Sequence, residues 1–221
     1  MNRKIETIIF DLDGTLIDSL EDIADSANTV LRDYGLPVHP KEDYRFYVGD
    51  GLTTLVHRIA PVGAPEPLLA DLRDGFVRIY EDNWRRATKP YPGIDEMLIA
   101  IQEKNCKLAI LSNKPDAFTK LCADHFFPHI SFLEVWGQRA GLAKKPAPEA
   151  ALLIAGKCGS VPQHCVFVGD TSVDIHTGRA ASMSAVGVSW GFREVAELEA
   201  AGADTIITKP EQLIAYVFST S

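Results

Sequence analysis

Residues 5–19 read IETIIFDLDGTLIDS, and the apolar run at their start is followed at once by two aspartates, Asp11 and Asp13. The run is short, nearly continuous and rich in isoleucine, which is typical of a strand buried on both faces of a parallel sheet. The two carboxylates stand one residue apart with no Lys or Arg beside them, so they repel each other when both are charged. We therefore expect them to bind a cation or to take part in a reaction.

Short apolar runs of the same kind recur later in the chain and predict the rest of a sheet. They cover residues 107–112, 165–169, 184–189 and 204–208. Segments with a helical pattern alternate with them, at residues 93–105, 115–127, 147–159 and 194–202. Strands that alternate with helices of this length indicate βαβ units with right-handed crossovers. The expected fold is α/β, with a Rossmann-like parallel sheet covered by helices on both faces.

Residues 16–86 interrupt this alternation with helical patterns only. Amphipathic stretches cover residues 18–35, 51–60 and 65–84. Ser19 and Asp22, three residues apart, resemble a capping box at the start of the first of these helices. Open α/β sheets bind ligands at the carboxyl ends of their strands, and we expect the inserted segment to form a helical cap domain there. Residues 1–15 and 87–221 then form the catalytic core domain.

The composition excludes several classes of protein. The 221 residues carry a formal net charge of -8, so a nucleic-acid-binding or anionic-membrane surface is not expected. No apolar run approaches the roughly 18 residues of a membrane span, and the N-terminal apolar stretch is too short for a secretory signal. The four cysteines form no CxxC pair, which favours reduced, buried thiols. We expect a cytoplasmic monomer or homodimer.

Polar residues stand at or near the ends of the later strands as well. They are Ser112 and Asn113 after the second run, the lysine pair 144–145 before a helix, and Asp170 and Asp174 after the third run. Because parallel strands deliver their carboxyl ends to one edge of the sheet, we expect these groups to converge with the first two aspartates. Clustered carboxylates without His or Cys favour a hard cation, and Mg²⁺ is the usual one where phosphate is handled.

This set of groups suits phosphoryl transfer. A lysine ammonium and the Ser112 hydroxyl can hold phosphoryl oxygens and offset their charge. One aspartate is then free to attack phosphorus and form an aspartyl-phosphate, and the other to protonate the leaving oxygen and later activate water. Divided roles explain the pair of aspartates better than metal binding alone.

The four groups resemble, in chain order, the four motifs of the haloacid dehalogenase (HAD) superfamily of phosphatases. DLDGTL resembles the first motif, LSNK the second, KKPAPE the third and GDTSVD the fourth, and the helical insertion resembles the C1 cap of that family. The resemblance implies that Asp11 is the nucleophile and Asp13 the general acid/base. It also implies that Ser112 binds the phosphoryl group and that Lys145 bridges phosphate and nucleophile.

The same resemblance implies a Mg²⁺ site and a type of reaction. The ion is expected on the Asp11 carboxylate, the Asp13 backbone carbonyl and Asp170, with support from Asp174. Three further residues of the motifs are expected to contact phosphate or substrate: Gly14, Thr15 and Asn113. Superfamily members that cleave carbon–halogen or carbon–phosphorus bonds replace the second aspartate. Its presence here implies phosphate-ester hydrolysis or phosphoryl transfer.

The cap segment 45–58, RFYVGDGLTTLVHR, is where we expect the substrate to be chosen. Gly49 and Gly51 predict a flexible loop before a helix start, which either binds an anion through free backbone N–H groups or is a simple turn between helices. The loop resembles that of phosphoglycolate phosphatases and their close relatives. Arg45 or Arg58 is expected to pair with a small carboxylate.

The expected partner is thus a small phosphorylated metabolite, with 2-phosphoglycolate as the leading substrate of a Mg²⁺-dependent phosphatase. Sugar phosphates, nucleoside monophosphates and pyrophosphate remain alternatives, because relatives that act on them share the layout. A second enzyme hypothesis is a phosphomutase of the β-phosphoglucomutase type, which returns the phosphoryl group to a sugar. The third hypothesis is a non-catalytic phosphate-binding protein, and the intact set of aspartates with Lys145 argues against it.

Overall fold

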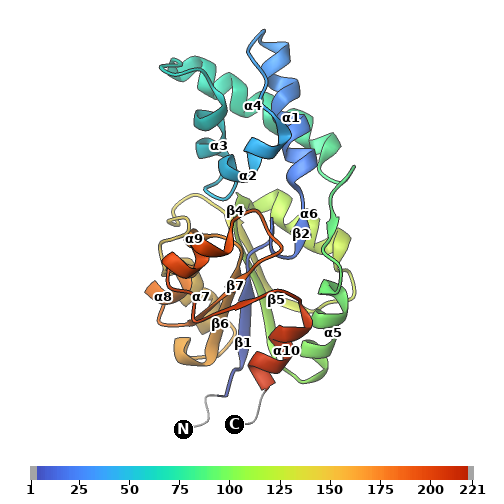
Figure 1. The fold of residues 1–221 in the computed structure, drawn as a ribbon, viewed down its shortest axis with the longest axis vertical. Coiled ribbons are helices and arrows are strands. Elements are labelled where there is room, and N and C mark those ends of the chain that lie inside the picture. The colour runs from blue at the N-terminus through green and yellow to red at the C-terminus, as the bar shows by residue number, and fades with distance from the viewer. Residues whose placement is uncertain (1–3, 219–221) are drawn as a thin grey trace.

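A computed structural model describes residues 4–218 of the chain and is built around one parallel sheet (Figure 1). The strands lie in the order β5-β4-β1-β6-β7-β8, and every neighbouring pair runs parallel. They are β1 (Thr7–Phe10), β4 (Lys107–Pro115), β5 (Phe132–Gln138), β6 (Cys165–Gly169), β7 (Ser184–Val188) and β8 (Thr205–Ile207). The predicted α/β class and parallel sheet are thereby confirmed.

Strand β1 lies at the centre of the sheet, and all of its residues are buried. It pairs with β4 on one side and with β6 on the other, so that Phe10 is in register with both Ile110 and Val168. The N–H of Asp11 continues this pairing and donates to Val168 O at 2.9 Å. The backbone ladder thus delivers Asp11 to the carboxyl edge, between the ends of two neighbouring strands.

Helices cover both faces of the sheet, as predicted. One face carries α5 (Ile94–Glu103), α6 (Asp116–Phe126) and α10 (Glu211–Phe218), and the other carries α7 (Glu149–Lys157), α8 (Ser172–Ala180) and α9 (Val195–Ala200). Side chains alternate along β1, so Ile8 and Phe10 join one apolar core and Ile9 joins the other. Burial of each such side chain contributes roughly 1.5–3 kcal/mol, which explains why a short apolar run is enough to hold the central strand.

Strand β5 and helices α8 and α10 were not predicted from the sequence, nor was the 3₁₀ turn η2 (Pro162–His164). Strand β5 is an edge strand, so its sequence FLEVWGQ lacks a continuous apolar run and Leu133 is 55% exposed. Helix α8 has a weakly amphipathic sequence and packs on β6 and β7. The sequence of β5 lacks a continuous or alternating apolar pattern, and that of α8 lacks a clear apolar face, so neither shows the periodicity by which strands and helices are recognised.

The helices of the inserted segment stand beyond the carboxyl ends of the strands, at the top of Figure 1. They are α1 (Leu20–Asp33), the 3₁₀ turn η1 (Lys41–Asp43), α2 (Tyr44–Tyr47), α3 (Leu52–Ile59) and α4 (Glu66–Asn83). Two short antiparallel strands, β2 (Ile17–Asp18) and β3 (Lys89–Pro90), carry the chain into and out of this segment. We call these helices and the loops that join them the cap. The division of the chain into two domains at residues 16–86 stays a prediction.

The predicted capping box at the start of α1 is wrong. The side chain of Ser19 caps no N–H of the helix and instead donates to Asp13 Oδ1 at 2.6 Å. The Asp22 carboxylate accepts the N–H groups of Ala87 and Thr88 at 2.9 Å and 2.8 Å. Both polar groups therefore tie α1 to segments outside the helix. Partners that are remote along the chain leave no signature in the local sequence.

The four cysteines are buried and none forms a disulfide, in agreement with the prediction. Burial raises the pKa of the Cys165 thiol to about 12, so this residue stays protonated and behaves as a small apolar side chain. Among residues 4–218, no helix combines the length and the apolarity that crossing a membrane requires.

Candidate active site

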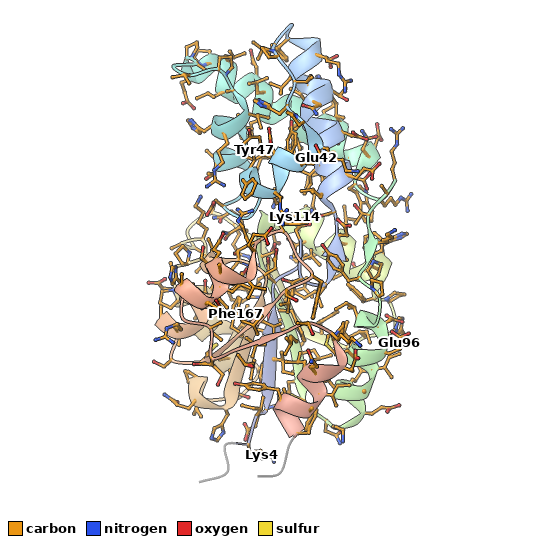
Figure 2. All side chains as sticks on the ribbon, viewed as in Figure 1. Lys4, Glu42, Tyr47, Glu96, Lys114 and Phe167 are labelled. Atoms are coloured by element: carbon orange, nitrogen blue, oxygen red, sulfur yellow. The ribbon has the colours of Figure 1, made fainter. Side chains whose placement is uncertain are left out.

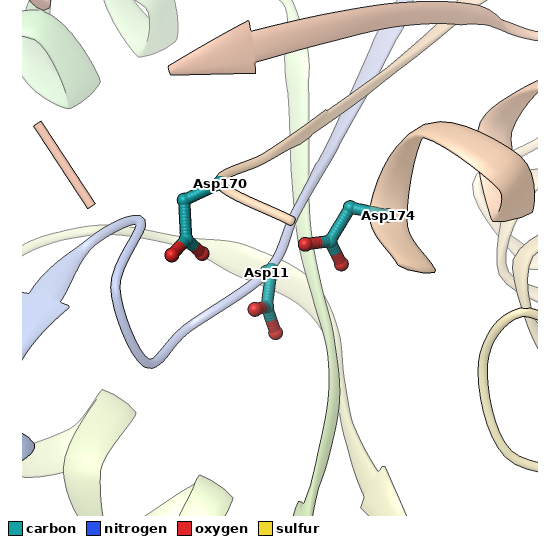
Figure 3. Close-up of side chains that lie close together, drawn as sticks. All are labelled: Asp11, Asp170 and Asp174. Atoms are coloured by element: carbon teal, nitrogen blue, oxygen red, sulfur yellow. The ribbon is translucent and has the colours of Figure 1, made fainter. Parts of the chain in front are cut away.

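Three aspartates from different parts of the chain meet at the carboxyl edge of the sheet (Figure 3). Asp11 follows β1, Asp170 follows β6, and Asp174 stands in the first turn of α8. One carboxylate oxygen of each lies within 4.8 Å of those of the other two. The residues are 6%, 0% and 1% exposed, in the same order. The predicted convergence of the strand ends is confirmed for these three groups, which we call the carboxylate cluster.

Glycines make room for this close approach. Gly14 has a φ of +87°, in the left-handed region, and a Cβ on it would lie 2.3 Å from Asp170 Oδ2. A Cβ on Gly191 would lie 2.2 Å from Asp170 Cβ. Since side-chain atoms do not pack at such distances, a larger residue at either position would displace the carboxylate. Gly14 therefore contributes to the site by leaving room for the Asp170 carboxylate.

Hydrogen bonds orient two members of the carboxylate cluster. Asp170 accepts the Thr15 hydroxyl on Oδ1 at 3.1 Å and the Phe192 N–H on Oδ2 at 2.8 Å. Asp174 Oδ2 accepts the N–H and the hydroxyl of Thr171 at 3.1 Å and 2.7 Å, which closes a capping box at the start of α8. The Thr15 side chain, predicted to contact phosphate or substrate, is thus directed at a carboxylate of the protein.

Lys145 supplies positive charge to the carboxylate cluster. Its Nζ lies 2.7 Å from both Asp11 Oδ1 and Asp174 Oδ1, and its side chain is 2% exposed. Burial raises the pKa of Asp11 to about 7, with Lys145 opposing the shift and Asp174 adding to it. Burial and the charges of Asp174 and Asp11 raise the pKa of Asp170 well above its usual range. One ammonium group does not balance three carboxylates.

The carboxylate cluster fits a hard divalent cation. Its donors are carboxylate oxygens, the ligands that Mg²⁺ and Ca²⁺ prefer. The negative charge left over beside Lys145 is buried, and a cation in the cluster would neutralise it. Asp11 Oδ1 is buried and, although it contacts the Lys145 ammonium, accepts no hydrogen bond of regular geometry. The three aspartates could therefore hold a metal ion, whereas the Asp13 carboxylate is not part of this group.

Asp13 has partners of its own. Its Oδ1 accepts the Ser19 hydroxyl at 2.6 Å and the Lys114 ammonium at 2.8 Å. Lys114 also donates to Tyr80 Oη at 2.8 Å, and its Nζ lies 4.8 Å from the centre of the Tyr80 ring. Burial opposes the charge on Lys114, but Asp13 together with Tyr80 and Cys122 outweighs it and holds the pKa of the ammonium well above its usual range. The two aspartates of the opening motif therefore sit in separate ion pairs.

Lys114 was not among the predicted site residues. Figure 2 shows it where the cap helices meet the core. It is the last residue of LSNK, directly after Asn113, so a signal was present in the sequence. Its role depends on its two partners, which are Asp13, just after β1 and 101 positions earlier along the chain, and Tyr80 on α4, 34 positions earlier.

Ser112 and Asn113 stand together at the end of β4 but serve the site differently. Ser112 lines a cavity beside Asp11. Asn113 Oδ1 accepts the Lys145 N–H at 2.9 Å, and Nδ2 donates to Lys145 O at 3.1 Å and to Gly49 O at 3.0 Å. The amide of Asn113 therefore joins the segment that carries Lys145 to residues 48–51, the loop between α2 and α3, which we call the cap loop.

A cavity of about 50 Å³ lies over Asp11 and Asp13, between core and cap; we call it the substrate cavity. Ser112 and Lys114 complete its polar floor. Its apolar walls come mainly from α1, α3, α4 and α6, through Ile23, Leu52, Leu55, Phe76 and Phe118. Gly49 and Gly51, predicted to contact phosphate or substrate, also line it.

The structure does not bring Arg45 and Arg58, the predicted partners of a carboxylate, to this cavity: neither is among the described residues that line it. Arg45 Nη2 pairs with Glu194 Oε1 at 3.1 Å, and its Nε donates to Phe192 O at 2.8 Å. Arg58 Nη2 pairs with Asp50 Oδ2 at 2.6 Å. Both guanidinium groups are engaged by other parts of the protein.

A third arginine, which the sequence did not single out, fastens the cap loop to the core. Arg193 Nη2 donates to Val48 O at 3.0 Å, and Lys144 Nζ donates to Asp50 O at 2.6 Å. Together with the hydrogen bond from Asn113 to Gly49, these contacts hold the loop over the carboxyl edge. The cap loop therefore lines the substrate cavity together with the cap helices.

In comparisons with known proteins, the cap and most of the core match a single family. A family model described as haloacid dehalogenase-like hydrolase matches residues 8–188. The phosphoglycolate phosphatase of Haemophilus influenzae is 30% identical, over 97% of this chain and 99% of that protein. That of Pseudomonas syringae pv. tomato is 33% identical, over 86% of this chain and 72% of that protein. The crystal structure of a predicted phosphoglycolate phosphatase from Haemophilus somnus has a TM-score of 0.90 at 27% identity, covering 96% of this chain and 97% of that one.

Proposed function

The chain belongs to the haloacid dehalogenase-like hydrolases and is a phosphoric monoester hydrolase, and we propose that it cleaves small phosphate monoesters through a covalent aspartyl-phosphate with the help of Mg²⁺. The observation that carries the proposal is that two aspartates with different partners face one cavity. Asp11 belongs to the carboxylate cluster beside Lys145, whereas Asp13 is held by Ser19 and Lys114. A nucleophile and a proton donor require such separate surroundings.

In this proposal Asp11, Asp170 and Asp174 hold Mg²⁺, with the backbone carbonyl of Asp13 as a further ligand. The chemistry that the ion supplies when bound is positive charge, which lowers the repulsion between the carboxylates and an incoming phosphate ester. The grouping of the carboxylate oxygens within 4.8 Å and the charge that Lys145 leaves unbalanced support this assignment.

The reaction steps follow from the positions of the two aspartates. An Asp11 oxygen attacks phosphorus while the bond to the ester oxygen breaks, and protonated Asp13 gives its proton to that oxygen. Asp13, now a carboxylate, takes a proton from a water molecule whose oxygen attacks the phosphorus of the aspartyl-phosphate. Inorganic phosphate leaves, and both aspartates return to their starting states. Ser112 and Lys145 bind the phosphoryl oxygens in both steps.

The leading substrate in this proposal is 2-phosphoglycolate. The relatives from Haemophilus influenzae and Pseudomonas syringae pv. tomato bear the name phosphoglycolate phosphatase. The apolar walls of the substrate cavity, such as Leu52 and Phe76, offer no hydrogen-bond partner for sugar hydroxyls. This supports a short ester over a sugar phosphate or a nucleotide.

The proposal includes a cap domain, residues 16–86, that opens to admit the ester and closes to exclude water. Its support is the narrow connection through β2 and β3 and the polar contacts that fasten the cap loop, such as Arg193 to Val48. Structures with and without a phosphate analogue test it. Identical positions of cap and core in both would contradict this part of the proposal.

Phosphate release by the purified protein tests the function. The panel contains 2-phosphoglycolate, ethyl phosphate, a hexose phosphate, a nucleoside monophosphate and pyrophosphate, each with Mg²⁺ and with EDTA. We expect release from the short esters only with Mg²⁺, and a phosphoryl group on Asp11 in mass spectra after acid quenching. Release in EDTA, or a phosphoryl group on another residue, contradicts the mechanism. Loss of a sugar phosphate without phosphate release would favour a phosphomutase instead.

A further inference from the structure

We propose that Lys114 selects the substrate by binding a carboxylate on the leaving group, next to the ester oxygen that Asp13 protonates. The inference rests on the phosphatase function proposed above. It names the class of ester: a phosphate monoester whose ester carbon bears a carboxylate. The leaving group is then recognised by Lys114 on β4, which Tyr80 on α4 holds in place. Arg45 on α2 and Arg58 on α3 take no part in this recognition.

Lys114 is the cation that faces the leaving group in the cavity. No other residue among the described ones lining the cavity carries a positive charge. The Lys145 ammonium is paired within the carboxylate cluster, and the guanidinium groups of Arg45 and Arg58 are paired outside the cavity. In the cavity, an anionic leaving group therefore meets one positively charged group, the Lys114 ammonium, that can form an ion pair with it.

The Lys114 ammonium keeps one donor for a ligand. An ammonium carries three N–H donors, and two of them donate to Asp13 Oδ1 and Tyr80 Oη, each at 2.8 Å. Within residues 4–218 the ammonium makes no third hydrogen bond. The lysine side chain is 5% exposed, so little water competes for that donor and a charged partner binds strongly there.

Distance restricts the leaving group to a short one. The ester oxygen has to come within about 2.6–3.2 Å of the Asp13 carboxyl to receive its proton. Lys114 Nζ lies 2.8 Å from Asp13 Oδ1. Because Oδ1 already accepts the Ser19 hydroxyl and the Lys114 ammonium, Oδ2 carries the proton, and the ammonium lies about 8 Å or less from the ester oxygen. A carboxylate attached to the ester carbon, as in 2-phosphoglycolate, can bind at that distance.

The walls of the cavity disfavour a longer polar leaving group. Leu52, Leu55 and Phe76 offer no hydrogen-bond partner in their side chains. Sugar hydroxyls pressed against these side chains would lose their hydrogen bonds to water without replacement. The fitting substrates therefore combine a short carbon chain with a single carboxylate.

Tyr80 holds the ammonium in place. It is 1% exposed, its ring stacks on Phe76 with centroids 5.2 Å apart, and it meets Phe118 edge-on at 5.0 Å. A hydroxyl fixed by aromatic neighbours restrains the lysine side chain before the substrate arrives, which lowers the entropy lost on binding. Tyr80 is thus a positioning residue that acts through Lys114.

The kinetic test compares 2-phosphoglycolate with ethyl phosphate, which has the same carbon count and no carboxylate. The wild-type kcat/KM should favour 2-phosphoglycolate, and Lys114→Met should lower that preference roughly 100-fold, the worth of a charged hydrogen bond. The ratio of the two kcat/KM values cancels effects of the substitution on Asp13, because both esters require the same proton. Lys114→Arg, which keeps the charge, should restore part of the preference.

Lys120→Met is the matched control, because Lys120 lies on α6, is 53% exposed at its side chain and pairs with Asp116 at the surface. It should leave the preference unchanged. An equal loss for both esters in Lys114→Met would show that Lys114 serves Asp13 alone and would overturn the inference, as would a wild-type preference near one. If the wild-type protein hydrolyses neither ester with Mg²⁺, the proposed function itself fails.

A binding measurement separates recognition from turnover. Calorimetric titrations in the Asp11→Asn background use 2-phosphoglycolate and inorganic phosphate as ligands. Adding Lys114→Met should weaken binding of 2-phosphoglycolate roughly 100-fold and that of phosphate far less. Equal weakening of both ligands contradicts a carboxylate site. Thermal unfolding of each variant verifies that the protein under titration is folded.

Discussion

The floor and the walls of the substrate cavity are built on opposite principles. The floor belongs to the core and consists of charged side chains in buried pairs, Asp11 with Lys145 and Asp13 with Lys114. The walls belong mostly to the cap and consist of apolar side chains such as Leu52. In the proposed mechanism Asp11 and Lys145 meet the phosphoryl group that every substrate shares, whereas Lys114 and the walls meet the leaving group, which differs between substrates. Substitutions of Asp11 and its metal-binding neighbours should therefore change the rate, and substitutions of Lys114 or of the walls the choice of ester.

The largest effect is expected in the floor, for Asp11→Asn. Turnover should fall by on the order of 10⁵-fold or more, as with other lost nucleophiles, because an amide does not attack phosphorus. The fold should persist, since asparagine has the same shape and its neutral amide relieves repulsion in the cluster. Phosphate-release assays and Tm measured on the same preparation check both statements. Activity near that of the wild type would remove Asp11 from the mechanism.

Asp170→Asn should act through the metal. We expect the Mg²⁺ concentration for half-maximal activity to rise by roughly 100-fold, the upper end of what the loss of a supporting group costs a metal site. The increase in Tm on adding Mg²⁺ should shrink in parallel, because the carboxylate cluster loses a ligand. Asp204→Asn, at a partly exposed carboxylate that lies 3.9 Å from Arg179, is the control. An unchanged Mg²⁺ requirement in Asp170→Asn would place the ion elsewhere.

The carboxylate cluster also predicts how stability depends on pH in the metal-free protein. Burial raises the pKa of Asp11 from 3.8 to about 7, so over this range the folded state keeps a proton that the unfolded chain has released. Because the unfolded state then binds fewer protons, the free energy of unfolding falls as pH rises. Tm in EDTA should decrease over this window, and Mg²⁺ should restore it most at the upper end. A Tm in EDTA that increases instead would argue against a crowded, buried cluster.

A wall substitution should change selectivity more than rate. Leu52→Ala enlarges the cavity, and the preference for 2-phosphoglycolate over a hexose phosphate should fall roughly tenfold, within the 1–3 kcal/mol that one methylene in a pocket is worth. The free energy of unfolding should fall by about 1–2 kcal/mol, less than for a fully buried leucine. Leu153→Ala, at a 52% exposed position on α7, is the control. An unaltered preference would mean that this wall does not meet the leaving group.

The smallest effect is expected for Arg58→Ala. Its guanidinium is paired with Asp50 and does not line the cavity. The KM for 2-phosphoglycolate should change by less than about fivefold, the most that a surface ion pair contributes. If Arg58 instead binds the carboxylate, as the sequence led us to expect, KM should rise roughly 100-fold. This one measurement therefore distinguishes Arg58 from Lys114 as the residue that binds the carboxylate of the substrate.

Prediction of the fold from the sequence succeeded where a strand is buried on both faces. Residues 8–10 and 165–169 carry continuous apolar runs because helices cover both sides of them. It failed at β5, where one edge and part of the side chains remain exposed. The predicted capping box is wrong for another reason. Ser19 and Asp22 have suitable side chains, but Ser19 donates to Asp13 and Asp22 accepts from Thr88 instead.

Prediction of the candidate site also succeeded for some features and failed for others. Parallel pairing carries each strand end to one edge, so residues that follow strand ends, such as Asp11 and Asp170, converge whatever their neighbours are. Strand pairing does not determine which lysine or arginine forms an ion pair with which carboxylate. Lys114 was overlooked because its partners lie far away along the chain, and Arg45 was expected in the cavity because its partner Glu194 was unknown.

The sequence alone therefore specifies the chemical content of this protein: a parallel sheet, carboxylates and a lysine at its carboxyl edge, and helices inserted above it. These features arise from local periodicity and from backbone pairing, which short stretches encode. The assembled fold assigns the partners, with Asp11 beside Lys145 and Asp13 beside Lys114, and an apolar enclosure above them. The physical reason is that an ion pair or a cavity wall forms between side chains that only packing brings within a few ångströms.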